Sequence, residues 1–94
     1  MEEQALRYNQ DKPQYSLIDF KSLEPLVRVM EFGAKKYDRE NWKKGLSKEN
    51  ILDSLLRHSL KLSDGEEIDE ESKLHHIGHI MANCMFYSYF FIKK

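Results

Sequence analysis

Cysteine is nearly absent from this sequence, since Cys84 is the only one among 94 residues. A disulfide framework within the chain is therefore excluded, and so is a zinc site built from cysteines. Cys84 falls in an apolar stretch, where we expect it to be a small buried hydrophobic residue. With four glycines and two prolines, the chain also contains no Walker A loop, no Gly-rich dinucleotide turn and no nucleophile elbow.

Long hydrophobic runs and an excess of charge of one sign are missing as well. The acidic N-terminus has no apolar stretch of the kind found in signal peptides, and His, Asn and Ser interrupt the apolar C-terminal run, so we expect no membrane partner. The net charge of -1, with 33% charged residues, argues against a broadly basic surface for a nucleic acid polymer. Because the chain has a single cysteine and shows neither a signal peptide nor a membrane span, we expect a reduced, cytoplasmic setting.

Apolar residues recur at helical spacing in three segments. The first runs from about Ser22, a plausible N-cap, to Tyr37. The second runs from Ser47 to Ser63 and stops at Asp64-Gly65. The third begins near Asp69 or Glu70 and continues to about Ile92. We predict an all-α fold: a small antiparallel bundle of about three helices in a single domain, 1–94, with residues 1–20 as an extended arm.

The third segment is apolar on nearly all sides, which is typical of a helix that is central in a bundle or shared between subunits. A chain with three helices has little mass to cover such a helix, so we expect a homo-oligomer that completes the bundle. The apolar residues of the arm could lie against the helical core; these are Tyr15, Leu17, Ile18 and Phe20.

All four histidines lie in the second half of the chain. Ser72, His76, His79 and Asn83 would form one polar stripe on a helix, and this stripe could hold a metal, a phosphate or a nucleobase. A structural polar network, internal or at a subunit interface, is the favoured interpretation for any single histidine. For the stripe as a whole, next to an acidic turn, a functional interpretation is favoured.

The acidic turn carries Glu66, Asp69 and Glu71, the kind of carboxylates that magnesium accepts together with water and phosphate oxygens. On composition alone a solvated acidic loop is the favoured interpretation of these carboxylates. The Arg57-His58 pair precedes this turn. Arg57 could clamp a phosphate or pair with Asp53 one helical turn earlier, and these two possibilities remain open.

Basic, aromatic and amide side chains gather at Lys36-Tyr37 and Asn41-Trp42. Such a set suits a nucleotide, because cations meet phosphates, aromatic rings stack on the base and amides bind its edge. Trp42 taken alone is better explained as a residue that anchors a loop.

The motifs in order resemble a known family. They are Arg7-Tyr8-Asn9, Lys12-Pro13, Phe32-Gly33-Ala34-x-Lys36-Tyr37, Asn41-Trp42-x-x-Gly45, Arg57-His58, Gly65-Glu66-x-x-Asp69-x-Glu71-Ser72 and His76-x-x-His79-x-x-x-Asn83. The family is the N-terminal domain of phage dATP/dGTP diphosphohydrolases (MazZ-like), related to MazG-type all-α nucleotide pyrophosphohydrolases. Its members usually have Gly in place of Lys73 and Pro in place of His75.

The resemblance implies an oligomeric enzyme, in the host cytoplasm if a phage encodes it. Such an enzyme would hydrolyse a purine dNTP (dATP or dGTP) to dNMP and pyrophosphate with Mg²⁺ or Mn²⁺. It implies metal binding by Glu66, Asp69 and Glu71, and proton transfer by His58 or His79 beside the catalytic Glu66 and Asp69. The implied substrate-binding residues are Arg7, Lys36, Tyr37, Asn41, Trp42, Arg57, His76 and Asn83.

Two other functions use the same residues. A non-catalytic phage protein could sequester a nucleotide, or a cyclic nucleotide signal of host defence, without needing a metal. A subunit-interaction protein could use the His/Asn stripe to close an oligomer interface.

Overall fold

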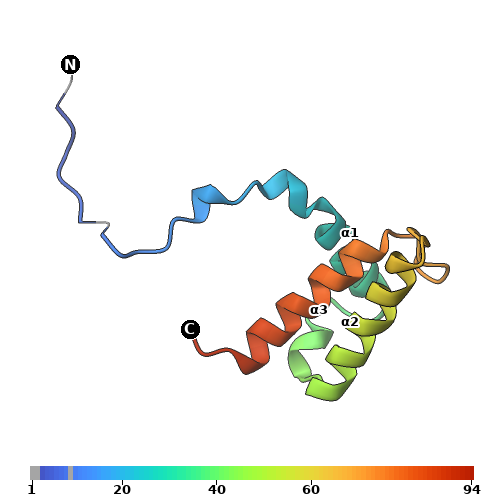
Figure 1. The fold of residues 1–94 in the computed structure, drawn as a ribbon. Coiled ribbons are helices and arrows are strands. Elements are labelled where there is room, and N and C mark those ends of the chain that lie inside the picture. Colours follow the sequence, from blue (N-terminus) through green and yellow to red (C-terminus); the bar gives the residue numbers. More distant parts are fainter. Residues whose placement is uncertain (1–2, 9) are drawn as a thin grey trace.

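The computed structural model describes residues 3–8 and 10–94, and this part of the chain folds as the predicted small all-α bundle (Figure 1). Residues 1–2 and Asn9, which belongs to the Arg7-Tyr8-Asn9 motif, lie outside the described residues. The helices are α1 (Glu24–Lys36), α2 (Lys48–Ser63) and α3 (His76–Phe91), with short 3-10 turns η1 (Tyr15–Leu17), η2 (Phe20–Leu23) and η3 (Asn41–Lys44).

Helix α1 begins two residues later than Ser22, and the prediction that Ser22 is its N-cap is wrong. Leu23 occupies the N-cap position and makes no capping bond with its side chain. Ser22 lies in η2, where its hydroxyl donates to the carboxylate of Asp19 at 2.5 Å. Pro25 is tolerated because the backbone N–H groups of the first helical turn have no partner within the helix.

Helix α2 matches its prediction at both ends. The hydroxyl of Ser47 accepts a bond of 3.0 Å from the backbone N–H of Asn50, as an N-cap should. At the other end, the backbone N–H of Gly65 donates to Leu62 and that of Glu66 donates to Lys61, both at 3.0 Å. This is a Schellman motif, and it requires the positive φ of +96° that Gly65 adopts.

Helix α3 starts at His76, so the predicted start near Asp69 or Glu70 is wrong. Residues 66–75 form an irregular loop instead, in which Asp69 binds Ser72 and Lys73 takes a left-handed φ of +63°. The N-cap of α3 is His75, whose Nδ1 accepts from the backbone N–H of Ile77 at 3.0 Å. Asp69, one of the carboxylates that suggested a helix start, therefore caps a turn that precedes the helix.

Helix α3 packs against both α1 and α2 and forms the centre of the bundle (Figure 1). Val29, Ile51 and Ala82, one residue from each helix, form the small buried apolar core. Gly78 allows α1 and α3 to touch, because a Cβ atom there would overlap the carbonyl oxygen of Pro25 and lie 2.9 Å from Cγ2 of Val29.

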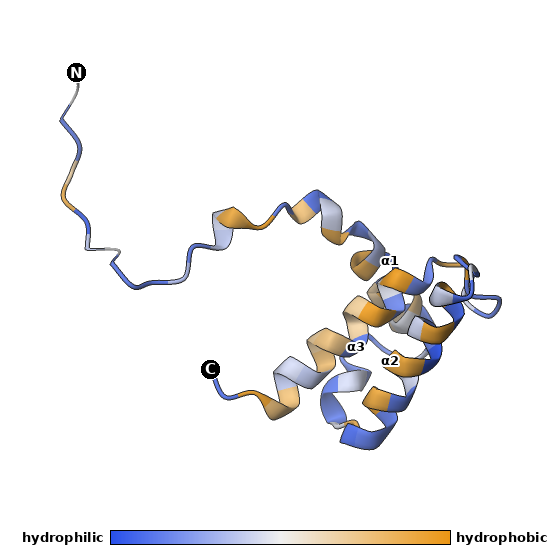
Figure 2. Cartoon of the chain, viewed as in Figure 1, coloured by the Kyte–Doolittle hydropathy of each residue, from blue (hydrophilic) through white to orange (hydrophobic). Residues whose placement is uncertain are grey.

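The arm that precedes α1 extends away from the bundle, so the expectation that its apolar residues lie against the core is wrong (Figure 1). Its exposed side chains include Tyr15, Leu17, Ile18 and Phe20. Cys84 is exposed too, although we expected it to be buried. Figure 2 shows orange, apolar positions along α2, α3 and the arm. Among the described residues, no helix is long and apolar enough to cross a membrane.

Candidate functional site

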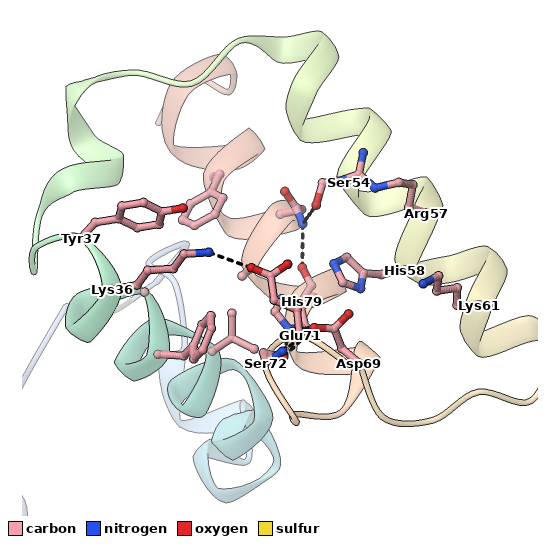
Figure 3. A pocket seen from close by; sticks show the side chains of 16 residues that line it. Lys36, Tyr37, Ser54, Arg57, His58, Lys61, Asp69, Glu71, Ser72 and His79 are labelled. Carbon is pink, nitrogen blue, oxygen red and sulfur yellow. Dashed lines mark hydrogen bonds and ion pairs between the residues drawn. The ribbon is translucent and has the colours of Figure 1, made fainter.

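A polar cavity of about 480 Å³ opens between the three helices and the 66–75 loop (Figure 3). α1 contributes Lys36 from its last turn, and α2 contributes Arg57 and His58. The full lining is Val29, Phe32, Gly33, Lys36, Tyr37, Ser54, Arg57, His58, Lys61, Asp69, Glu71, Ser72, His79, Ala82, Asn83 and Phe86. Thus four separate chain segments bring cationic, acidic and imidazole groups to one concave surface, as ligand-binding sites commonly do.

Eight of the residues predicted to act in catalysis or to bind substrate or metal line this cavity, while others lie elsewhere. Those in its lining are Lys36, Tyr37, Arg57, His58, Asp69, Glu71, His79 and Asn83. Arg7 is exposed on the arm and does not belong to the lining, and His76 is fully buried behind it. Glu66 is also outside the lining, with its carboxylate on His76. Among the described residues, no ion pair joins Asp53 to Arg57, whose side chain is part of the cavity wall.

A second, apolar chamber of about 240 Å³ adjoins the first and shares part of its wall. Phe32, Tyr37, His79 and Phe86 belong to both chambers. Asn41 and Trp42 line the apolar chamber only. Trp42 packs against Phe86 with ring centroids 5.1 Å apart, so it both anchors η3 on α3 and forms a wall of the chamber.

A chain of hydrogen bonds connects Glu66, His76 and His58. Nε2 of His76 lies 2.7 Å from Oε2 of Glu66, and Nδ1 of His76 lies 2.8 Å from Nδ1 of His58. An ionised Glu66 accepts, so Nε2 of His76 carries a proton and donates. Nδ1 of a neutral His76 then accepts from Nδ1–H of His58, which leaves Nε2 of His58 with a free lone pair.

Asp69 is held in place by the turn that follows it. Its Oδ2 accepts from the backbone N–H and from the hydroxyl of Ser72, both at 2.8 Å. The same hydroxyl lies 2.7 Å from Nε2 of His79, and His79 stacks on His58 with centroids 4.3 Å apart and planes 3° from parallel. Ser72 was expected on the helical stripe. It lies before α3 but still contacts His79.

The environment keeps these histidines neutral and Asp69 ionised. Burial, assisted by the neighbouring His79, lowers the pKa of His58 to about 4. Burial likewise lowers the pKa of His79. Burial would raise the pKa of Asp69, but the two bonds from Ser72 outweigh it and hold that pKa below its usual value. The site thus offers imidazole lone pairs and a carboxylate at neutral pH.

Lys36 and Glu71 form an ion pair of 2.7 Å across the cavity, between the end of α1 and the loop (Figure 3). This pairing raises the pKa of Lys36 and lowers that of Glu71. Both side chains are exposed, and solvent screening leaves such an exposed ion pair with little net contribution to stability. A phosphate could therefore displace Glu71 from Lys36 at small cost.

Within the described residues, one group of three side chains is arranged to hold a metal ion: His58, Asp69 and His76, whose ligand atoms all lie within 4.8 Å of one another. Glu66 and Glu71, expected as ligands with Asp69, are each bonded to another side chain, His76 and Lys36 respectively. The structure therefore brings Asp69 together with two histidines.

Several residues of the cavity were not predicted. Lys61 follows Arg57 by one helical turn, and this spacing could have suggested a second cation on the same face. Ser54, which accepts from the side-chain amide of Asn83 at 3.1 Å, gave no signal in the sequence. Phe86, which belongs to the apolar third segment of the sequence, lines both chambers.

Comparison with known proteins agrees with the order of motifs. The profile of a family described as dATP/dGTP diphosphohydrolase, N-terminal, matches residues 2–94. The chain belongs to this family. A relative from Salmonella phage PMBT28, named dATP/dGTP diphosphohydrolase, is 40% identical over 82 residues, which cover 87% of this chain. The chain spans only 28% of the length of that relative. No solved structure matches the chain.

Proposed function

We propose that this domain binds a purine deoxynucleoside triphosphate, dATP or dGTP, and hydrolyses it to the monophosphate and pyrophosphate with Mg²⁺ or Mn²⁺. The observation that carries this proposal is the pair of adjoining chambers, one polar and one apolar, with Tyr37 and His79 in the shared wall. Such a division suits a nucleotide, which has a charged end and a flat, largely apolar end.

The polar chamber would receive the triphosphate. Arg57 could make paired hydrogen bonds to phosphate oxygens, and Lys36 and Lys61 would add positive charge. These cations would offset the charge that develops on the phosphate oxygens as the bond between the α and β phosphates breaks. The apolar chamber would receive the base, against Trp42 and Tyr37, with Asn41 positioned for its edge.

Proton transfer would fall to the stacked pair His58 and His79. Burial keeps both rings neutral, so each offers a nitrogen lone pair to a proton, but the pKa of about 4 makes His58 a weak base and favours His79 as the acceptor. A divalent ion, when bound near the ionised Asp69, would lower the pKa of the attacking water. The name of the phage relative, dATP/dGTP diphosphohydrolase, supports this choice of substrate.

Incubation with dGTP or dATP and Mg²⁺ or Mn²⁺, followed by chromatography, tests the proposal. We expect dGMP or dAMP together with pyrophosphate, and loss of product with Asp69→Asn. The base position is tested separately by Trp42→Ala, which should raise KM more than it lowers kcat. No monophosphate above the level of Asp69→Asn would overturn the enzymatic function.

A second candidate is a nucleotide-binding protein without turnover, including one that sequesters a cyclic nucleotide of host defence. The bonding of the carboxylates favours binding without turnover, because Glu66 is already bonded to His76 and Glu71 to Lys36. Calorimetry with dGTP and a panel of cyclic nucleotides distinguishes the two. Tight binding that survives EDTA, without product, would support sequestration.

A further inference from the structure

We propose that His58, His76 and Asp69 form a binding site for a divalent transition-metal ion, such as Mn²⁺, Co²⁺ or Zn²⁺, with Glu66 as its outer carboxylate. The inference rests on the proposed function only in placing the ion at the wall of the phosphate chamber. It favours a transition metal over Mg²⁺, because imidazole nitrogen suits transition metals whereas Mg²⁺ takes oxygen ligands.

The geometry of the three ligand atoms supports the site. All lie within 4.8 Å of one another, and the Nδ1 atoms of His58 and His76 are 2.8 Å apart. Bonds of about 2.1 Å from two nitrogens to one ion place those nitrogens roughly 3–4 Å apart. Small rotations of the side chains would therefore be enough to bring the three atoms around one ion.

The surroundings of each ligand are those of a metal site. His76 is fully buried and donates Nε2–H to Glu66, which leaves Nδ1 as the ligand atom. Metal-bound histidines commonly donate their second N–H to a carboxylate, which fixes the ring and increases its basicity. Asp69 is oriented in the same way by two bonds from Ser72.

The burial of His76 means that both of its ring nitrogens need partners. A fully buried imidazole in a domain with such a small apolar core costs free energy unless its nitrogens are bound. Without metal, the two imidazoles satisfy each other by sharing one proton between their Nδ1 atoms. An ion would replace that proton as the common partner, and the proton would move to the other nitrogen of His58.

The proposed ion would give the three histidines different roles. His58 and His76 would hold the ion, and His79, stacked on His58 at 4.3 Å, would remain as the imidazole that accepts a proton. This division explains why the cavity contains two parallel imidazoles rather than one.

The test is direct titration of the metal-free protein with Co²⁺, Mn²⁺, Zn²⁺ and Mg²⁺, by calorimetry and, for Co²⁺, by visible absorption. We expect one ion per chain, and Mn²⁺ bound at least tenfold more tightly than Mg²⁺. His58→Gln and Asp69→Asn should each weaken binding by more than about 100-fold, and Glu66→Gln by about 10–100-fold.

Glu70→Gln is the matched control, since Glu70 is an exposed carboxylate of the same loop. It should leave the affinity unchanged. His58 and Asp69 are preferred to His76 for substitution because they are only partly buried, and circular dichroism will verify that their variants fold. Equal affinities for Mn²⁺ and Mg²⁺, or binding that persists in both His58→Gln and Asp69→Asn, would overturn the inference.

The metal assignment and the proposed hydrolysis can be refuted separately. Turnover with Mg²⁺ but no site for Co²⁺ would refute the metal assignment alone. Saturable Co²⁺ binding without dGMP or dAMP would refute hydrolysis alone.

Discussion

His58 contacts several parts of the candidate site. It bonds to His76, stacks on His79 and lines the polar cavity. These contacts require a neutral ring, since a second proton on His58 would face the neighbouring imidazoles and Arg57. Stability and ligand chemistry therefore depend on the same protonation state.

This dependence predicts how the metal-free protein responds to acid. The pKa of His58 is about 4 in the folded chain and about 6.5 when unfolded, so the unfolded state binds more protons between these values. The contribution of His58 to the free energy of unfolding should therefore be complete above pH 6.5 and should decrease as the pH falls toward 4. Urea unfolding in EDTA at pH 7.5, 6 and 5 measures it.

The control is His58→Gln, which should be less stable at neutral pH but should lose less on acidification. His79, whose pKa is also lowered, accounts for the remaining dependence. Parallel pH curves for the two proteins would contradict the assignment.

Lys73 adopts a backbone conformation that costs free energy. Its φ of +63° lies in the left-handed region, which costs a residue with a Cβ about 1–2 kcal/mol. The residue donates its backbone N–H to the carbonyl of Asp69 at 2.8 Å, so the loop that presents Asp69 depends on this conformation.

We therefore expect Lys73→Gly to stabilise the fold by up to about 1 kcal/mol, since part of the relief is offset by the larger entropy of glycine when unfolded. Thermal unfolding should show a midpoint a few degrees higher. Glu70→Gly in the same loop, where φ is not positive, should lower the midpoint. A lower midpoint for Lys73→Gly would show that the side chain itself matters.

At the scale of elements, the crossing of α1 and α3 is set by backbone contact rather than by side chains. Gly78 faces Pro25 and Val29 with no room for a methyl group. This close approach places Lys36, at the end of α1, and His79, in the first turns of α3, on the same cavity.

Gly78→Ala should destabilise the protein by about 1–3 kcal/mol through overpacking, although alanine is the better helix former. Urea unfolding measures the change. Gly33→Ala is the matched control, because a Cβ there meets nothing within 4 Å, and it should stabilise α1 by up to about 1 kcal/mol. Equal effects of the two substitutions would refute the packing argument.

The helix boundaries also show how much of the fold could be predicted from the sequence. Local signals located α2 at both ends, because Ser47 and Asp64-Gly65 act within a few residues. The start of α3 was misplaced because carboxylates suit a helix N-terminus as well as a turn, and the sequence does not reveal that Asp69 caps Ser72 instead. The pairing of Glu66 with His76 depends on the path of the whole loop, so spacing alone could not predict it.

The molecule as a whole exposes more surface than a compact chain of its mass. Its accessible area is 8240 Å², against about 5,700 Å² expected for 11.2 kDa. The radius of gyration is 17.2 Å, against about 12 Å for a compact domain of this length. The extended arm contributes to both values, and so do uncovered apolar side chains on α2, namely Leu52, Leu56 and Leu60.

We expect a second copy of the chain to cover the leucine face of α2, so that light scattering gives a multiple of the 11.2 kDa chain mass. Because the extended arm accounts for part of the excess area, this expectation rests on the three leucines of α2, which are 40%, 55% and 66% exposed. Leu56→Glu with Leu60→Glu should shift the mass toward the monomer, and Glu49→Lys, an exposed polar change on α2, should not. A monomer at high concentration would contradict this expectation.

Trp42 gives the molecule a built-in reporter. It is the only tryptophan, it lies against Phe86, Tyr89 and Phe90, and its ring forms part of the apolar chamber. All indole fluorescence therefore originates from one wall of that chamber. A purine that stacks there should quench the emission, so occupancy of the chamber can be followed in solution without a label, with metal and without.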